Sequence, residues 1–449
     1  MPAPPPTLII DNGAYTLKCG FSSPTPSLSS CHLIPNCIAR SRDRRSLVGT
    51  QLSTCRDFGG MSFRRPVEKG YLVNWEAQKE VWDHTFLSDS ADGPELRCDP
   101  HDTRLILAEA PNAPLSLQNN ADQIVFEEYE FMELFRCVGP SVIPWHDIPA
   151  LFSGAPALPP PTKPAEAVMI VDSGFSHTHI YTTLLGQPWN SATRRIDIGG
   201  KFLTNYLKEL VSLRTWNMME EPYLISQVKE AVCFVSTDFE RDLDRCKRLK
   251  DAKNDMVRDY VLPDYNTGKG GFARNHLPRS ARPGPAADEE QVMVLGNERF
   301  TVPELLFNPA DVGLKQAGAV ECVLQALEMV PERLRAVLLA NIVLVGGNAA
   351  IPGFKERFEL ELRPMAMDEA TVRVAVPEDP VKYIWLGAAR MALDDEFMKA
   401  RTVTRKEYME HGLLWCQKKM AGEDVRGGGE VRDTAQERER RENRSHRRK

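Results

Sequence analysis

Three features are missing from this sequence of 449 residues. None of its ten cysteines forms a CxxC pair, and no cationic start followed by an apolar stretch indicates secretion. No apolar run approaches the roughly 20 residues that a transmembrane helix needs. The cysteines are therefore expected to be reduced thiols of an intracellular protein. The nearest approach to a zinc cluster is Cys31, His32 and Cys37, and their spacing does not match zinc-ligand patterns.

The chain also lacks a strong charge of either sign. Its 56 basic and 62 acidic residues give a net charge of −6, so the overall balance does not predict a nucleic-acid coat. With 42 % hydrophobic and 26 % charged residues, the composition is that of a globular protein and excludes a disordered or coiled-coil chain. A prior of roughly 100–200 residues per domain predicts about two to four structural units, enough to hold a cleft.

Two segments predict β-hairpins with an Asp and a Gly at the turn. In TLIIDNGAYTLKCGFSS (7–23), an apolar run is broken at Gly13 and then resumes. In AVMIVDSGFSHTHIYTTLLG (167–186), apolar and β-branched residues flank the turn at Gly174. Taken singly, each turn is also compatible with a plain hairpin.

A third glycine turn has a different form. The segment NIVLVGGNAAIPGFKERF (341–358) predicts a short buried strand, then Gly346 and Gly347, then a helix. This arrangement leaves backbone N–H groups facing a bound anion. A carboxylate beside each hairpin turn, Asp11 and Asp172, suits hydrated Mg²⁺. In this order and spacing, the three turns predict a nucleotide-phosphate site in a cleft.

Four stretches have apolar residues spaced three or four positions apart, which predicts amphipathic helices that face the core. They are 75–86, 123–137, 200–213 and 223–234. Residues 266–288, rich in Gly, Pro and basic side chains, show no periodicity and predict a surface insertion at about 264–290.

The composition from residue 421 to 449 predicts a disordered charged tail. From residue 437 onward it carries seven basic and three acidic side chains. This run is either solvated or a nuclear-import or nucleic-acid contact.

The motifs of this chain resemble those of the actin family, in the same order, over residues 8–416. DNGAYTLKCGF (11–21) resembles the family's first phosphate loop, and DSGFSHTH (172–179) resembles the second. The other matching segments are RRPVEKGYLVNWEAQKEVWDHTF (64–86), LILAEAP (105–111), IDIGGKFLTNYLKEL (196–210), KEAVCFVSTDFE (229–240), GNERFTVPELLFNP (296–309), VLVGGNAAIPGF (343–354) and KYIWLGAARMA (382–392).

The resemblance implies an α/β fold of the type shared by actin, sugar kinases and heat-shock-chaperone ATPases. Two lobes, each a mixed sheet flanked by helices, would surround a nucleotide cleft. The expected boundaries are a loose N-terminus at 1–6, lobe I at 7–165 and 378–420, lobe II at 166–377, and the tail at 421–449.

The resemblance also implies ATP or ADP with Mg²⁺ at the bottom of the cleft. The implied nucleotide-binding residues are Asp11, Gly13 and Lys18 in the first loop, Asp172 and Gly174 in the second, Lys229 and Glu230 on the purine side, and Gly346 and Gly347 in the adenosine loop. The metal would be held through water by Asp11 and Asp172.

Three positions in the phosphate loops depart from the family. Ala14 replaces a serine whose hydroxyl contacts phosphate, and Tyr15 replaces the glycine after it with a bulky side chain. Phe175 replaces an acidic residue that helps to order the Mg²⁺ waters. These substitutions put phosphate binding in question.

The position that orients the attacking water has also changed. Aligning FEEYEF (126–131) with the family places Gly139 or Pro140 where actin has a glutamine. Neither side chain can hydrogen-bond a water. We therefore assign no catalytic residue and expect a protein that is not an enzyme, with nucleotide binding and little or no hydrolysis.

The loop with which actin inserts into the neighbouring protomer is cut to a few basic residues here. It falls between CHLIPNCIARSRDRR (31–45) and a strand predicted at 47–52, within a shortened loop at about 36–50. Without that loop a head-to-tail contact loses its main element, so the chain is predicted not to form a homopolymer.

These departures, with the insertion, most resemble one nuclear subfamily of actin-related proteins. Its members are subunits of the SWR-type chromatin-remodelling complex, which exchanges a variant histone into nucleosomes. The resemblance implies a structural, transcription-regulating role beside a SNF-family ATPase and other subunits. It also implies indirect contact with histones and nucleosomes, and a nuclear location with a cytoplasmic pool. From the basic run of the tail we expect weak DNA contact, and from the lack of a long apolar run we expect no membrane partner.

Two other functions fit the same fold. A cytoskeletal actin-like protein is one, and the missing inter-protomer loop counts against it. A weak ATPase or phosphotransferase of the actin and sugar-kinase fold is the other, and the sequence places no general base for a hydroxyl acceptor.

Overall fold

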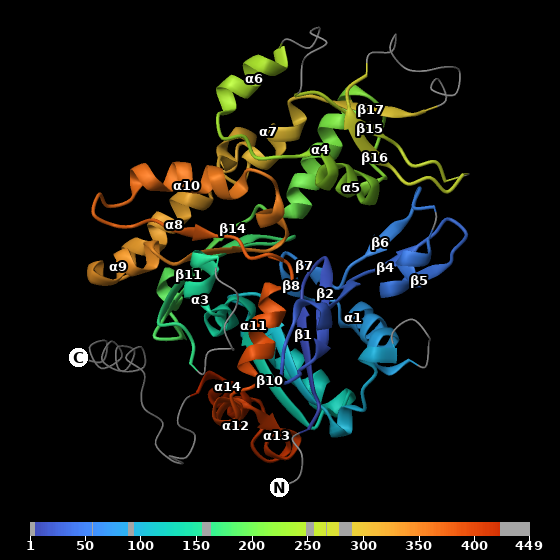
Figure 1. Cartoon of the computed structure of the whole chain (residues 1–449). Coiled ribbons are helices and arrows are strands. Elements are labelled where there is room, and N and C mark those ends of the chain that lie inside the picture. The colour runs from blue at the N-terminus through green and yellow to red at the C-terminus, as the bar shows by residue number, and fades with distance from the viewer. Residues whose placement is uncertain are drawn as a thin grey trace, which may run out of the picture.

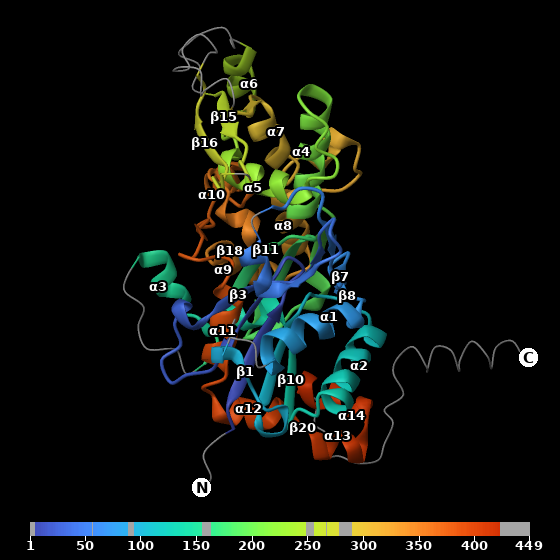
Figure 2. The same cartoon turned by 90° about the vertical axis from the view of Figure 1, so that its right-hand side faces the viewer.

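Two lobes, each built on a mixed β-sheet, make up the protein (Figure 1, Figure 2). The structure is a computed structural model that describes residues 5–55, 57–88, 94–154, 163–247, 256–265, 267–277 and 290–422. In Figure 1 the first lobe, blue to teal with the red C-terminal helices, lies below the second, which is green to orange.

The sheet of the first lobe has six strands in the order β20-β10-β9-β1-β2-β3. β1 pairs antiparallel with β2 and parallel with β9, which in turn pairs parallel with β10. The antiparallel pair confirms the first predicted hairpin. The strands are β1 (Thr7–Asn12), β2 (Thr16–Phe21), β3 (His32–Pro35), β9 (Arg104–Glu109), β10 (Glu133–Val138) and β20 (Val403–Thr404).

The sheet of the second lobe repeats this plan. β11 pairs antiparallel with β12 and parallel with β18, so the second predicted hairpin is also confirmed. The strand order is β13-β12-β11-β18-β19, with β14 on β12. The strands are β11 (Ala167–Ser173), β12 (Thr178–Leu184), β13 (Gln187–Pro188), β14 (Arg194–Ile196), β18 (Ile342–Val345) and β19 (Val374–Ala375).

The central strands are short apolar runs that end at a polar residue. Leu8, Ile9 and Ile10 of β1 are fully buried, as are Val168 to Val171 of β11. Strands buried on both faces need such continuous runs, because the helices of each lobe cover their sheet. Each run therefore delivers its terminal carboxylate, Asp11 or Asp172, to the edge of the apolar core.

Helices surround each sheet. The first lobe carries α1 (Trp75–Trp82), α2 (Leu115–Gln123), α3 (Ile148–Ser153), α11 (Tyr383–Met391), α12 (Asp395–Arg401), α13 (Arg405–His411) and α14 (Leu413–Ala421). The second carries α4 (Gly200–Arg214), α5 (Pro222–Val232), α6 (Phe239–Lys247), α7 (Glu298–Glu304), α8 (Ala319–Glu328), α9 (Glu332–Leu339) and α10 (Phe354–Met365). In the described part of the chain, no helix is both long and apolar enough to cross a membrane.

Small sheets extend each lobe toward the other. In the first lobe these are the β4-β5-β6 sheet and the β7-β8 pair, and in the second the β16-β15-β17 sheet. In Figure 1, the blue β4-β5-β6 sheet lies below β16 and α5. Their strands are β4 (Ile38–Arg40), β5 (Ser46–Val48), β6 (Ser62–Arg64), β7 (Val67–Glu68), β8 (Tyr71–Leu72), β15 (Arg258–Val261), β16 (Phe272–Asn275) and β17 (Val292–Leu295).

The prediction of a helix at 123–137 is wrong. The helical segment there is α2 and a π-helical turn, Ile124–Glu128, and the chain then forms strand β10. Glu130, with φ of 60°, breaks the helix. The apolar residues of this stretch fit a helical period, but they also fit a strand buried between β9 and β20, and pairing with those strands decides the outcome.

Three other expectations change in part. Residues 266–288 were expected to be a loop without regular structure. They contain strand β16, which pairs with β15 as an edge strand of its sheet. The strand predicted at 47–52 ends at Val48 and continues as a 3₁₀ helix, Gly49–Thr54. After Gly346 the chain makes a 3₁₀ turn, Gly347–Ala350, before α10 begins.

Several predictions fall outside the described residues. Most of the tail (423–449), the start of the loose N-terminus (1–4), and residues 266 and 278–289 of the insertion are among them. Of the N-terminal stretch that is described, the Pro6 carbonyl accepts a hydrogen bond from Arg104 N at 2.9 Å.

Candidate functional site

The three predicted glycine turns meet between the lobes. Asp172, at the end of β11, pairs in register with Val345, so Gly346 follows directly beside the second hairpin. Gly346 has φ of +89°, and a Cβ there would lie 2.4 Å from the Ser173 carbonyl oxygen and 2.9 Å from Asp172 Oδ1. Only glycine fits this position.

The first hairpin turn holds an ion pair beneath it. Lys18 Nζ lies 3.2 Å from Asp11 Oδ2, and neither side chain is much exposed. A Cβ on Gly13 would come within 2.6 Å of Lys18 Nζ, so the glycine leaves room for the ammonium group. The positive charge of Lys18, an expected nucleotide-binding residue, is thus already balanced by a carboxylate.

The carboxyl group of Asp172 faces the same place from the second lobe. Burial raises its pKa to about 7, the nearby charge of Asp11 adds to this, and Lys18 lowers it. Two carboxylates with one lysine between the hairpins resemble the floor of a cation or phosphate site. Among the described residues, however, no group of three or more His, Cys, Asp or Glu side chains is arranged to hold a metal ion.

The predicted purine side is occupied by internal hydrogen bonds. Lys229 on α5 donates from Nζ to the Gly200 carbonyl at 3.1 Å and to Thr204 Oγ1 at 3.0 Å. Burial lowers the pKa of Lys229. Its neighbour Glu230 is exposed and accepts a hydrogen bond from Ser226 Oγ at 3.2 Å.

The adenosine loop is tied to the second hairpin. Asn348 donates from Nδ2 to the Gly174 carbonyl at 2.9 Å and to Ser173 Oγ at 3.1 Å. Gly347 has no atom within 4 Å of its Cβ position, so it is not restricted as Gly346 is. The structure therefore gathers the two carboxylates, Lys18 and the glycines Gly13, Gly174 and Gly346, while Glu230 hydrogen-bonds on its own helix.

The tips of the two hairpins touch through aromatic side chains. The rings of Tyr15 and Phe175 have centroids 4.8 Å apart, with an angle of 37° between their planes. The guanidinium carbon of Arg65 lies 4.7 Å from the Tyr15 ring centre and 5.2 Å from that of Phe175. Sequence reasoning identified the two aromatic substitutions but missed Arg65, whose only signal is a basic residue before β7.

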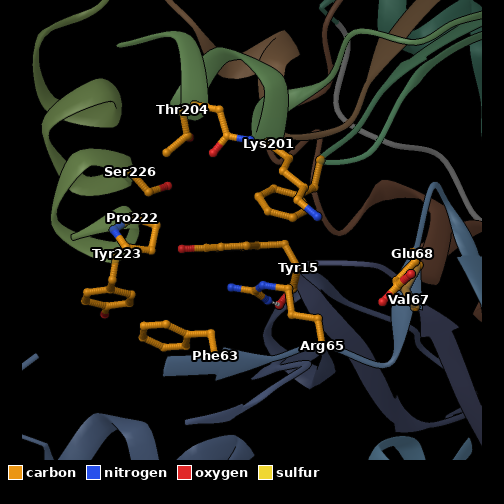
Figure 3. A pocket seen from close by; sticks show the side chains of 12 residues that line it. Tyr15, Phe63, Arg65, Val67, Glu68, Lys201, Thr204, Pro222, Tyr223 and Ser226 are labelled. Atoms are coloured by element: carbon orange, nitrogen blue, oxygen red, sulfur yellow. Dashed lines mark hydrogen bonds between the residues drawn. The ribbon is translucent and has the colours of Figure 1, made fainter. Parts of the chain in front are cut away.

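A cavity of about 250 Å³ lies beside this cluster. Figure 3 shows the Tyr15 side chain extending across this cavity, with Arg65 beside it. The hydroxyl of Tyr15 is directed toward Ser226 and Pro222 of α5. Burial raises the pKa of the Tyr15 hydroxyl, so it remains a neutral phenol.

The mouth of the cleft is bridged as well. Tyr223 of α5 stacks on Phe58 of the first lobe, with ring centroids 4.1 Å apart and planes 16° apart. Phe63 of β6 lies 5.8 Å from the same ring. Gly60 N donates to Glu221 Oε1 at 3.0 Å.

A third contact crosses from the β7-β8 turn. Arg195 of β14 donates to Tyr71 Oη at 3.0 Å and to His177 Nε2 at 2.8 Å. Burial lowers the pKa of His177 to about 4, so the ring is neutral and its Nε2 accepts. A Cβ on Gly70, whose φ is +81°, would lie 2.6 Å from His177 Nδ1, so glycine permits this approach.

The residues present do not fit a nucleotide with its phosphates between the hairpin turns. The floor has the carboxylates and the lysine, yet the space between the turn tips holds two aromatic rings in contact. At the position of the family's water-orienting glutamine, Gly139 and Pro140 are buried in the 3₁₀ segment Gly139–Trp145. Neither has a polar side-chain atom.

Comparisons with known proteins identify the family of the chain. A sequence model described as actin matches residues 3–421. Actin-like protein arp6 of Aspergillus fumigatus is 48 % identical over 447 residues, which cover 93 % of this chain and 95 % of that protein. Actin-related protein 6 of Neurospora crassa is 47 % identical over 434 residues, covering 94 % and 95 %. Actin-related protein 6 of Drosophila melanogaster is 37 % identical over 408 residues, covering 90 % and 97 %.

The chain therefore belongs to the actin family, as an actin-related protein. The expected actin-like α/β fold, with mixed sheets flanked by helices, is confirmed.

Proposed function

We propose that this protein is a structural, non-polymerising subunit of an SWR-type chromatin-remodelling complex, which exchanges a variant histone into nucleosomes and so regulates transcription. The observation that carries the proposal is the 37–48 % identity, over 90–94 % of the chain, to proteins named actin-like protein arp6 or actin-related protein 6 in fungi and in a fly. The departures from actin in the sequence resemble the same nuclear subfamily.

The β4-β5 hairpin supports the absence of polymerisation. Residues 41–45 alone connect these strands, and the turn is closed by Ser41 N donating to the Arg45 carbonyl at 2.9 Å and Arg44 N to the Ser41 carbonyl at 3.0 Å. A turn of this length has no segment to insert into a neighbouring protomer. A heterologous head-to-tail contact without its inserting element is weakened.

The cleft supports a role without catalysis. Gly139 and Pro140 cannot position an attacking water, and the hairpin tips are occupied by side chains of the protein. The proposed partners are a SNF-family remodelling ATPase and other subunits, with histones and nucleosomes contacted indirectly and DNA weakly through the basic tail. The proposed location is the nucleus, with a cytoplasmic pool.

Affinity isolation tests this function. The full chain is tagged at its N-terminus, isolated from nuclear extract in moderate salt, and its bound proteins are identified by mass spectrometry, with the tag alone as control. We expect a discrete large complex that contains a SNF-family ATPase and histone-handling subunits. Recovery mainly with conventional actin and myosins would contradict the proposal and favour the cytoskeletal alternative.

Sedimentation tests the second half of the proposal. We expect the protein at micromolar concentration with Mg²⁺ and salt to stay in the supernatant, while actin treated in parallel sediments as filaments. Sedimentable filaments of this chain, or steady-state ATP hydrolysis near the filament-stimulated rate of that actin, would overturn it.

A further inference from the structure

We propose that this protein closes its own nucleotide cleft. Side chains of the two lobes take the place of the phosphates, so that the closed arrangement forms and persists without ATP or ADP. This inference concerns the cleft alone and holds whichever complex the protein belongs to.

The first argument is the space between the turn tips. The two turns keep the Asp and Gly of the actin family's phosphate loops, but their tips present Tyr15 and Phe175 to each other. Ring centroids 4.8 Å apart place the two side chains in van der Waals contact. A phosphate group cannot enter between them unless at least one ring leaves.

The second argument is charge. A nucleotide brings several negative charges, which need cations that are not otherwise engaged. Lys18 is paired with Asp11, and Arg65 donates from Nη1 to the carbonyls of Tyr15 at 3.2 Å and Asn36 at 3.5 Å. The Arg65 guanidinium also lies against both aromatic rings. Two of the cations near the turns thus serve the protein's own groups, while Lys201 lines the adjacent cavity.

The third argument is that the lobes meet at separate points along the cleft. Tyr15, Phe175 and Arg65 meet at its centre, and Phe58 stacks on Tyr223 at its mouth. At the β7-β8 turn, Arg195 joins Tyr71 to His177. Each contact pairs a side chain of the first lobe with one of the second, so closure does not depend on a bridging ligand.

The cavity beside the rings is small. Its volume of about 250 Å³ lies below the range of about 300–1,000 Å³ that is usual for small-molecule sites. Tyr15 itself forms one of its walls, as Figure 3 shows. If a base were bound in the cavity, the phosphates attached to it would still meet the aromatic side chains before they reached the floor.

The test uses the purified full chain and ATP or ADP with Mg²⁺ as the probe. Nucleotide released by denaturation is quantified by chromatography, and the melting temperature is measured with and without millimolar nucleotide. We expect no stoichiometric nucleotide and no shift of the melting temperature. A ligand that binds only the folded state, with a dissociation constant far below this concentration, would raise the melting temperature by several degrees. Co-purified stoichiometric nucleotide, or a saturable rise with ATP and Mg²⁺, would overturn the proposal.

Variants separate cleft closure from ordinary packing. In Tyr15→Gly with Phe175→Asp, the family's residue types return to the turn tips. We expect this double variant to melt lower than the wild type without nucleotide and to recover part of the loss when ATP and Mg²⁺ are added. The matched control is Tyr15→Phe, which keeps the ring and loses only the hydroxyl directed toward Ser226; it should melt closer to the wild type than the double variant does and, like the wild type, should not respond to ATP.

Further outcomes follow from this pair of variants. A double variant that melts as the wild type does and ignores ATP would show that the rings do not hold the cleft closed. If the double variant does not fold, Phe175→Asp alone takes its place under the same criteria. The nucleotide content of the wild type still decides the proposal without any variant.

Discussion

The floor and the tips of the two hairpins have opposite chemistry. At the floor, Asp11, Lys18 and Asp172 keep the charged pattern of a phosphate and metal site. At the tips, a few residues away, Tyr15 and Phe175 form an apolar contact between the lobes. The floor residues also have a structural role, because Lys18 neutralises the charge of Asp11. The two lie under a turn that has room for Lys18 only because Gly13 has no side chain. The presence of the motif therefore shows that the turn is present. Whether the turn binds a ligand has to be judged from the side chains around it.

The glycine behind the floor gives the largest expected effect. We expect Gly346→Ala to lower the free energy of unfolding by about 3 kcal/mol or more, because a Cβ at φ of +89° would strain the backbone and strike the Ser173 carbonyl. Denaturant unfolding of the full chain measures this. Gly347→Ala is the matched control, since nothing lies within 4 Å of its Cβ position, and it should remain near the wild type. Equal losses in both variants would contradict the role of Gly346.

The pH dependence of the floor comes next. The folded Asp172 carboxyl has a pKa of about 7, raised from 3.8, so the folded state binds a proton that the unfolded state has released between these values. Stability from this group is therefore present at low pH and is lost as pH rises from about 4 to about 7.

Replacing that carboxyl with an amide should remove this loss. We expect Asp172→Asn to be more stable than the wild type at pH 8 by on the order of 1–2 kcal/mol, with the difference shrinking toward pH 5. Denaturant midpoints across this range measure it, and Asp43→Asn is the control for losing an exposed negative charge. A difference that grows toward low pH would contradict the reading of Asp172.

The smallest expected effect is at the tips. We expect Arg65→Lys to cost about 1 kcal/mol, because lysine keeps the charge but loses the planar group that lies against two rings and donates to the Tyr15 carbonyl. Arg40→Lys, at an exposed position of β4, should change stability by a few tenths of this. If both variants behave alike, the cation contributes only charge to the tips.

Sequence reasoning found what depends on local order along the chain. Both hairpins, three of the four amphipathic helices and the strand before Gly346 follow from residue patterns within one segment. The helix expected at 123–137 failed because pairing with β9 and β20, which lie far away in the sequence, determines the strand β10.

The candidate site divides in the same way. Tyr15 and Phe175 stand out in the sequence as departures within known loops. That they meet each other depends on how the lobes close, which no local pattern contains. Arg65, Tyr223 and Phe58 reach the cleft from separate elements, and only the folded structure brings them together.

The Tyr15 side chain can be regarded as a ligand that is covalently attached to its own site. Its local concentration is fixed by the chain, so its occupancy does not depend on the cellular supply of any small molecule. Where a bound nucleotide holds two lobes together, their spacing depends on which nucleotide is present. A tethered occupant would make that spacing a constant, and a partner that binds across both lobes would meet the same surface whatever the ratio of ATP to ADP.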